Sequence, residues 1–258
     1  MSAILETRGL TRTFGAVVAA KDINVRIEPG EIVGVIGSNG AGKTTCINMV
    51  TGYLPPSSGE ILFDGQSVLG RQPRAITRLG MARSFQVAQL FPKLTVLENA
   101  LVSLVAAEGP RPSFLRPLDT PERRAQADAI FAEFGVSRYR DALVSTVPQG
   151  VRKLVDIAMA LVSQPRMLFF DEPTSGVSIE EKFALMDTVM SVVRQHGVTV
   201  LFVEHDMEIV ARYVTRLMAF YSGEIIADGP PREVLGDARV QELVIGHHLD
   251  INALGEAA

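Results

Sequence analysis

The sequence contains a single cysteine, Cys46, among 258 residues. A lone thiol cannot form a disulfide within the chain, so a small scaffold held together by disulfides is excluded. The first residues also lack the basic and then apolar pattern of a secretory signal peptide. Both absences indicate a cytosolic chain.

Long apolar runs are also missing, although the mean hydropathy of +0.21 is high. The longest apolar stretches, such as residues 101–107, are far shorter than the roughly 20 residues that span a bilayer. We therefore expect no membrane-spanning helix. The surplus of apolar residues predicts a thick parallel-sheet core or surfaces that bind partners.

The chain has no large excess of charge of either sign, since 25 Lys and Arg oppose 29 Asp and Glu. The net charge of −4 gives no overall attraction to nucleic acid, and we expect no nucleic-acid partner. Any phosphate binding must therefore be local. Hydrophobic residues at 47% and charged residues at 21% are typical of a folded globular protein.

Three short apolar runs, residues 31–36, 166–170 and 198–203, show no alternation of polar and apolar residues. Such runs are typical of central parallel strands that are buried on both faces. Residues 23–27 alternate, and residues 61–65 follow a turn rich in Pro, Ser and Gly at 55–59, so both segments are predicted to form short antiparallel strands beside that sheet. The pattern favours an α/β fold.

Helix starts are predicted from capping residues. Thr95 with Glu98, and Ser178 with Glu181, each fit a capping box, and Thr120 before a proline fits an N-cap. The expected helices cover residues 95–107, 120–134 and 178–196.

The segment 87–163 contains helical patterns and no convincing strand. We therefore expect a P-loop NTPase core with a parallel sheet and flanking antiparallel strands, formed by residues 1–86 and 164–258. Residues 87–163 are expected to form an inserted helical subdomain.

A phosphate-binding loop is predicted between the first apolar run and a helix. Residues 37–44 match G-x-x-x-x-G-K-S/T at every fixed position. Lys43 would contact the β- and γ-phosphates, and the Thr44 hydroxyl would be a Mg²⁺ ligand. The alternative is a glycine turn with a surface lysine. The expected nucleotide-binding residues of this loop are Gly37, Ser38, Asn39, Gly40, Ala41, Gly42, Lys43, Thr44 and Thr45.

Polar side chains follow other predicted strands. Asp171 is expected to orient Mg²⁺ and Glu172 to polarise the attacking water. His205 is expected to contact the γ-phosphate, and Gln86 to sense the γ-phosphate or the metal ion. The alternatives are a solvated acidic pair, an exposed or structural histidine, and an ordinary glutamine at a strand end.

Together these residues resemble the nucleotide-binding subunit of an ABC transporter over essentially the whole chain. By this resemblance residues 37–45 form Walker A, Gln86 the Q-loop, residues 167–172 Walker B, residues 175–178 the D-loop and His205 the switch histidine. The resemblance implies an ATPase that uses ATP and Mg²⁺ and pairs head to tail with a second ATPase subunit.

Phe14 lies where this family carries an aromatic ring that stacks on adenine, and the alternative is an ordinary packed phenylalanine. Residues 83–99, 203–207 and 222–230 look like the LivG-type ATPases of branched-chain and other hydrophobic amino-acid uptake. That broad subgroup is similar to importers of amides, urea and small organic acids. The subgroup implies two transmembrane permease subunits, a periplasmic binding protein that acts indirectly, and a place on the cytoplasmic face of the inner membrane. The alternatives are a lipopolysaccharide-export type ATPase and a soluble assembly ATPase.

The family signature, Leu-Ser-Gly-Gly-Gln, is degenerate here. Pro148, Gln149 and Gly150 occupy its centre, and only the second glycine is kept. Pro148 has no hydroxyl to donate to a γ-phosphate in the other subunit, so we expect a heterodimer rather than a homodimer, with unequal ATP sites. The alternative is that backbone donors suffice and both sites work.

A coupling helix of the permease is expected to dock over residues 86–116. Four apolar residues suit such a groove and would suit a core equally well: Phe85, Leu90, Phe91 and Leu94.

Overall fold

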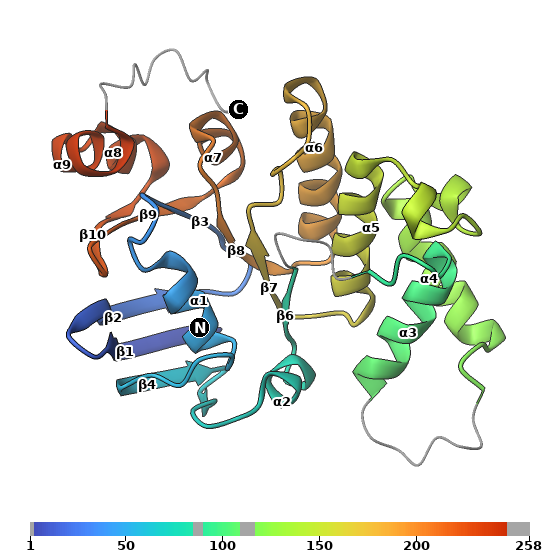
Figure 1. Ribbon diagram of the computed structural model, residues 1–258, viewed down its shortest axis with the longest axis horizontal. Helices are drawn as coiled ribbons and strands as arrows, with labels where there is room; N and C mark the ends of the chain where they lie inside the picture. The colour runs from blue at the N-terminus through green and yellow to red at the C-terminus, as the bar shows by residue number, and fades with distance from the viewer. Residues whose placement is uncertain (1–2, 85–89, 109–116, 247–258) are drawn as a thin grey trace. The chain divides into compact units, whose positions relative to one another are not determined.

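The computed structural model describes residues 3–84, 90–108 and 117–246. The chain forms two compact units (Figure 1). The first unit comprises Met1–Ile76 and Thr199–Ala258, and the second comprises Thr77–Val198.

One sheet of the first unit is antiparallel, with the strand order β2-β1-β4-β5. In β2 the buried residues Ile23, Val25 and Ile27 alternate with exposed ones, as the sequence pattern predicts. The strands are β1 (Leu5–Phe14), β2 (Val17–Ile27), β4 (Ser58–Phe63) and β5 (Gln66–Ser67).

The other sheet of the first unit has the order β10-β9-β3-β8. Strand β3 pairs in parallel with both β8 and β9, and β10 closes an antiparallel hairpin with β9. All residues of β3 and β8 are buried, which confirms the two expected central strands. The strands are β3 (Ile32–Gly37), β8 (Thr199–Val203), β9 (Arg216–Tyr221) and β10 (Glu224–Gly229).

Short helices follow these strands. The helix α7 is capped by Asp206, whose carboxylate accepts hydrogen bonds from the N–H groups of Glu208 and Ile209. The bounds of the helices are α1 (Lys43–Val50), α2 (Pro73–Arg78), α7 (Met207–Tyr213), α8 (Pro231–Gly236) and α9 (Ala238–Val240), followed by a π-helix at Gln241–Ile245.

The second unit contains a parallel strand pair, β6 (Met81–Arg83) and β7 (Met167–Asp171). Its helices α3, α4 and α5 pack on one another, and α5 also packs on α6. The helices are α3 (Val96–Glu108), α4 (Pro121–Glu133), α5 (Gln149–Val162) and α6 (Ile179–Gln195), with 3-10 turns at Ser137–Tyr139 and Val144–Thr146. Helices α3 to α5 lie inside the expected insertion 87–163, whose boundaries stay a prediction.

Two of the three predicted caps are confirmed. The Thr95 hydroxyl accepts from the Glu98 N–H at 3.1 Å while the Glu98 carboxylate accepts from the Thr95 N–H at 2.7 Å. The Thr120 hydroxyl accepts from the Arg123 N–H at 3.3 Å. The capping box at Ser178 is wrong: the Ser178 side chain makes no capping hydrogen bond. The Glu181 N–H donates instead to the backbone carbonyl of Ser178 at 3.1 Å, so the hydroxyl is not needed there.

Within the described ranges no helix is both long enough and apolar enough to cross a bilayer.

Candidate nucleotide-binding site

A tight loop joins the end of β3 to the start of α1 in the first unit. Gly42 is the N-cap of α1 with a φ of 102°, in the left-handed region that favours glycine. The Ala41 N–H donates to the Ser38 carbonyl at 3.1 Å and closes the turn. Ser38 and Gly40 are exposed at the tip of the loop. The predicted strand, loop and helix are therefore all present.

Two glycines of the loop lie so close to neighbouring strands that a side chain at either position would collide with them. A Cβ on Gly42 would lie less than 3.0 Å from the carbonyl oxygen of Ala19 in β2. A Cβ on Gly37 would lie 2.6 Å from the carbonyl oxygen of Phe220 in β9. The Gly223 N–H also donates to the Ala41 carbonyl at 3.0 Å. The loop is thus held from both sides by the protein itself, and such preorganisation favours anion binding.

Lys43 is folded back into this loop. Its side chain is buried, and its ammonium donates to the carbonyls of Gly37 at 2.5 Å and Ser38 at 3.0 Å. Thr44 is exposed on the first turn of α1, and Thr45 is partly exposed. The first N–H groups of a helix have no intrahelical partner, and the helix dipole adds positive potential there. The arrangement can therefore bind an anionic phosphate group.

His205 follows β8 in the same unit. Because β3 and β8 are neighbouring parallel strands, with Val35 opposite Val203, His205 and the loop leave the same edge of the sheet. The His205 side chain is exposed, while its backbone N–H donates to the buried Glu204 carboxylate at 3.1 Å. The exposed His205 residue thus leaves the sheet at the same edge as the phosphate loop.

Phe14 ends β1 and is 48% exposed. Phe14 is therefore not a core side chain, and its stacking on adenine stays a prediction. The Arg12 guanidinium lies 4.6 Å from the ring centroid and makes a cation–π contact.

The predicted carboxylates belong to the second unit, at the end of β7. Asp171 is only 14% exposed, and its Oδ2 accepts from Arg83 Nη2 at 2.9 Å. Glu172 has a φ of 51°, a left-handed conformation that is strained for a residue with a Cβ. The Ser175 N–H donates to the Glu172 carbonyl at 3.1 Å and holds the turn after the strand. Strain of this kind is concentrated at functional positions in proteins.

Arg83 is a residue to which sequence reasoning gave no role. It ends β6, the strand that pairs with β7, and its side chain is 8% exposed. A basic residue at the end of a strand beside an acidic strand end is the signal that could have identified it. Strand β6 stops at Arg83, and Gln86 and Phe85 lie outside the described residues.

The degenerate signature residues begin α5. Pro148 is the N-cap and contributes no side-chain capping bond. Pro148 and Gln149 are exposed and Gly150 is partly exposed. The start of the helix is thus open to solvent in this unit.

The expected docking residues are partly exposed. Phe91 is 53% exposed, so its core alternative is wrong, and Leu90 and Leu94 are half-buried. The buried Asn99 side chain fixes the Phe91 backbone, accepting from its N–H at 2.8 Å and donating to its carbonyl at 3.2 Å.

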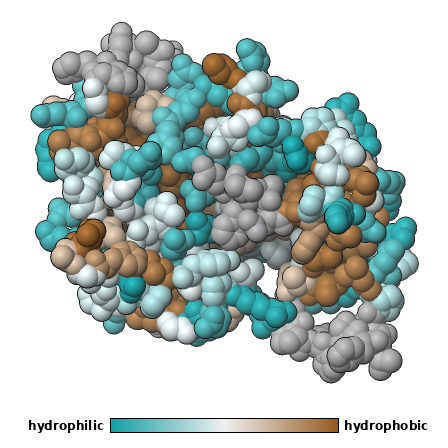
Figure 2. Space-filling model, in the orientation of Figure 1, coloured by the Kyte–Doolittle hydropathy of each residue, from teal (hydrophilic) through white to brown (hydrophobic). Residues whose placement is uncertain are grey.

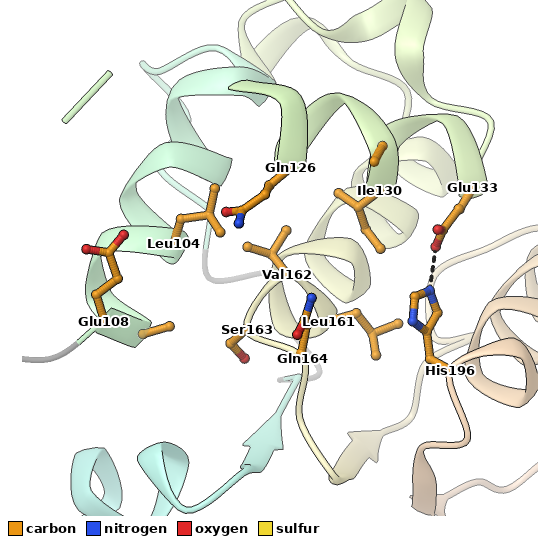
Figure 3. Close-up of a pocket in the computed structure, with 12 residues that line it drawn as sticks. Leu104, Glu108, Gln126, Ile130, Glu133, Leu161, Val162, Ser163, Gln164 and His196 are labelled. Carbon is orange, nitrogen blue, oxygen red and sulfur yellow. Dashed lines mark hydrogen bonds and ion pairs between the residues drawn. The ribbon is translucent and has the colours of Figure 1, made fainter. Parts of the chain in front are cut away.

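The second unit also holds a cavity of about 440 Å³ (Figure 3). Leu104, Ile130 and Leu161 form apolar walls, and His196 pairs with Glu133 at 2.7 Å on one side. Figure 2 shows hydrophobic residues at the surface over α3 and α4. None of the predicted site residues lines this cavity.

A family model described as ABC transporter matches residues 20–175. The chain belongs to the ABC transporter family. A branched-chain amino acid transport ATP-binding protein of Pseudomonas aeruginosa, BraF, is 32% identical over 94% of this chain and 98% of its own length. LivG of Escherichia coli K12, with the same description, is 33% identical over 94% of this chain and 98% of its own length.

Solved structures of the family have the same fold. The ADP conformation of an ATP-binding cassette of an ABC transporter gives a TM-score of 0.85 at 30% identity, covering 96% of this chain and all of that one. A nucleotide-free ATP-binding cassette from an ABC transporter gives a TM-score of 0.82 at 29% identity, and the match covers 93% of this chain and 98% of that one. The predicted P-loop NTPase fold of the ABC class is confirmed, and the protein is an ABC-type ATPase.

Proposed function

We propose that this chain is the ATP-hydrolysing subunit of an importer for branched-chain or other hydrophobic amino acids. The observation that carries this proposal is the similarity to BraF and LivG, which extends over 94% of the chain and nearly all of each relative. ATP binding by the loop at 37–45 would supply the energy for transport. Only the difference in ATP-binding free energy between the open and the closed state of the ATPase pair can drive a change in the transporter.

The nucleotide is bound by the first unit. The loop N–H groups surround the phosphates, and the Lys43 ammonium moves from the carbonyls of Gly37 and Ser38 to the β- and γ-phosphates. The exchange replaces two neutral acceptors with charged ones, which strengthens each hydrogen bond. Phe14 stacks on the adenine ring and His205 contacts the γ-phosphate.

Hydrolysis needs the carboxylates of the second unit. Glu172 polarises the attacking water as general base. Thr44, Asp171 and Gln86 would hold Mg²⁺, because hydroxyl, carboxylate and amide oxygens are the hard donors that this ion prefers. The burial of Asp171 beside a guanidinium fits a position where a carboxylate faces positive charge. Bound Mg²⁺ supplies neutralisation of the charge on the phosphates.

A second ATPase subunit completes each site through its signature residues. In this chain Pro148, Gln149 and Gly150 face the partner's ATP, and Gly150 N–H with the start of α5 replaces the missing serine. We infer a heterodimer in which the site built on this chain's Lys43 and Glu172 carries most turnover.

Two membrane permease subunits bind the ATPase pair, and the coupling helix contacts the surface around Phe91. The chain would then lie at the cytoplasmic face of the plasma membrane. The periplasmic binding protein communicates with it only through the permeases.

The test is transport by the reconstituted complex. The chain is copurified with its permeases and partner ATPase, the complex is placed in proteoliposomes with the binding protein, and ATP-driven uptake of labelled leucine, isoleucine and valine is measured. Lys43→Ala should abolish both ATP binding and uptake. Export of a lipid, or the absence of any copurifying membrane subunit, would overturn the importer assignment in favour of the export or assembly ATPase.

A further inference from the structure

The ion pair between Arg83 and Asp171 joins the ends of two neighbouring strands. Arg83 lies opposite Phe169 in the parallel register of β6 and β7. Residues 169 and 171 share one face of β7 because side chains alternate along a strand. The Arg83 side chain therefore reaches Asp171 diagonally, with Nη2 at 2.9 Å from Oδ2.

The pair is largely removed from water, with side-chain exposures of 8% for Arg83 and 14% for Asp171. Burying a carboxylate without a cation is costly, and removing one partner of a buried pair leaves the other charge uncompensated. The backbone fixes the geometry as well, because the Ser84 N–H donates to the Phe169 carbonyl at 2.9 Å. Asp171 is thus both neutralised and oriented by contacts within the protein.

We propose that Arg83 is a positioning residue that competes with Mg²⁺ for the Asp171 carboxylate. The guanidinium already pairs with Asp171, so a metal ion that this carboxylate holds must share it with a second cation. Arg83 therefore weakens the contribution of Mg²⁺ to ATP binding. This inference rests on the proposed role of Asp171 toward Mg²⁺.

The competition predicts a measurable coupling. The quantity is the Mg²⁺ factor, defined as the Kd of the full chain for ATP in EDTA divided by the Kd in excess Mg²⁺, both by calorimetry. Arg83→Met removes the competing charge with little change in length. We expect it to raise the Mg²⁺ factor about tenfold, which lies within the five- to 150-fold range typical of coupling between two binding events.

A merely structural role for Arg83 would lower thermal stability and leave the Mg²⁺ factor unchanged, and that result would overturn the proposal, as would a fall in the factor. Arg83→Gln, which keeps an N–H donor but loses the charge, should raise the factor in the same direction and guards against misfolding of Arg83→Met. In the Asp171→Asn background the effect of Arg83→Met should disappear.

The same set of variants distinguishes the competition by Arg83 from the proposed metal role of Asp171. If Asp171→Asn alone leaves the Mg²⁺ factor unchanged, the metal role of Asp171 fails. If Asp171→Asn lowers the factor but the Arg83 variants do not change it, only the competition fails.

Discussion

The side-chain amide of Gln149 lies against Gly176: a Cβ added to Gly176 would lie less than 3.0 Å from Gln149 Nε2. Gln149 is one of the predicted signature residues at the start of α5, and Gly176 lies in the turn before α6 that is predicted to be the D-loop. Gly176 has a φ of 76°, which strains any residue with a Cβ, and a side chain there would also displace the Gln149 amide. The segments predicted as signature and D-loop are therefore in direct contact.

This contact predicts that Gly176→Ala is more destabilising than an ordinary glycine substitution. Gly135 is the matched control, since its φ is 66° and nothing lies within 4 Å of an added Cβ. Backbone strain costs roughly 1–2 kcal/mol in either variant. Gly176→Ala should lower the free energy of unfolding in urea by only about 0.5 kcal/mol more than Gly135→Ala, because the flexible and exposed end of the Gln149 side chain must move to another rotamer. Equal losses, or full activity with Gln149 undisturbed, would contradict the contact.

Glu172 combines a proposed catalytic role with an unfavourable backbone conformation. Its φ of 51° suits glycine better than glutamate. Glu172→Gly should therefore raise the free energy of unfolding by about 1 kcal/mol while abolishing ATP turnover. Glu172→Gln keeps the strain and should also abolish turnover while ATP binding persists. Calorimetric unfolding and phosphate release measure the two effects, and a Glu172→Gln protein with undiminished hydrolysis would remove the assigned base.

The sequence predicted the elements that depend on local chemistry. The glycines of the phosphate loop, the caps at Thr95 and Thr120 and the apolar runs of β3 and β8 each specify their structure through neighbours in the chain. The capping box predicted at Ser178 is wrong because the Glu181 N–H donates to the backbone carbonyl of Ser178 and not to its hydroxyl. Arg83 is 88 residues from Asp171, so only the pairing of β6 with β7 reveals their contact.

The single thiol gives a pH-dependent prediction. Burial raises the pKa of Cys46 to about 12, although the residue as a whole is partly exposed. Unfolded cysteine has a pKa of about 8.5, so the folded state binds the proton more tightly. The resulting stability is fully present below that pH and is lost as the pH rises toward 12.

Two measurements check this. Alkylation of folded protein by iodoacetamide at pH 8.5 should be at least tenfold slower than alkylation of urea-unfolded protein, since the thiolate is the reactive form. The fall in the free energy of unfolding between pH 9 and pH 11 should be smaller in Cys46→Ala. Rapid labelling of the folded protein would mean that α1 opens readily or that the thiol is solvated.

Phe91 offers a test of permease docking that is independent of the nucleotide site. The residue is 53% exposed, and its backbone is held by the buried Asn99, so an apolar ring projects from a fixed point of the backbone. Phe91→Ser should leave ATP binding by the isolated chain unchanged, because the residue is remote in sequence from the loop at 37–45. It should weaken copurification with the permeases about tenfold, in line with loss of one buried aromatic anchor.

Leu69→Ser is the control, since Leu69 is an apolar residue of the first unit that is 38% exposed. If both variants copurify like the unmodified chain, the docking surface lies elsewhere; if both lose the permeases, the effect is a general loss of surface apolarity rather than a specific contact.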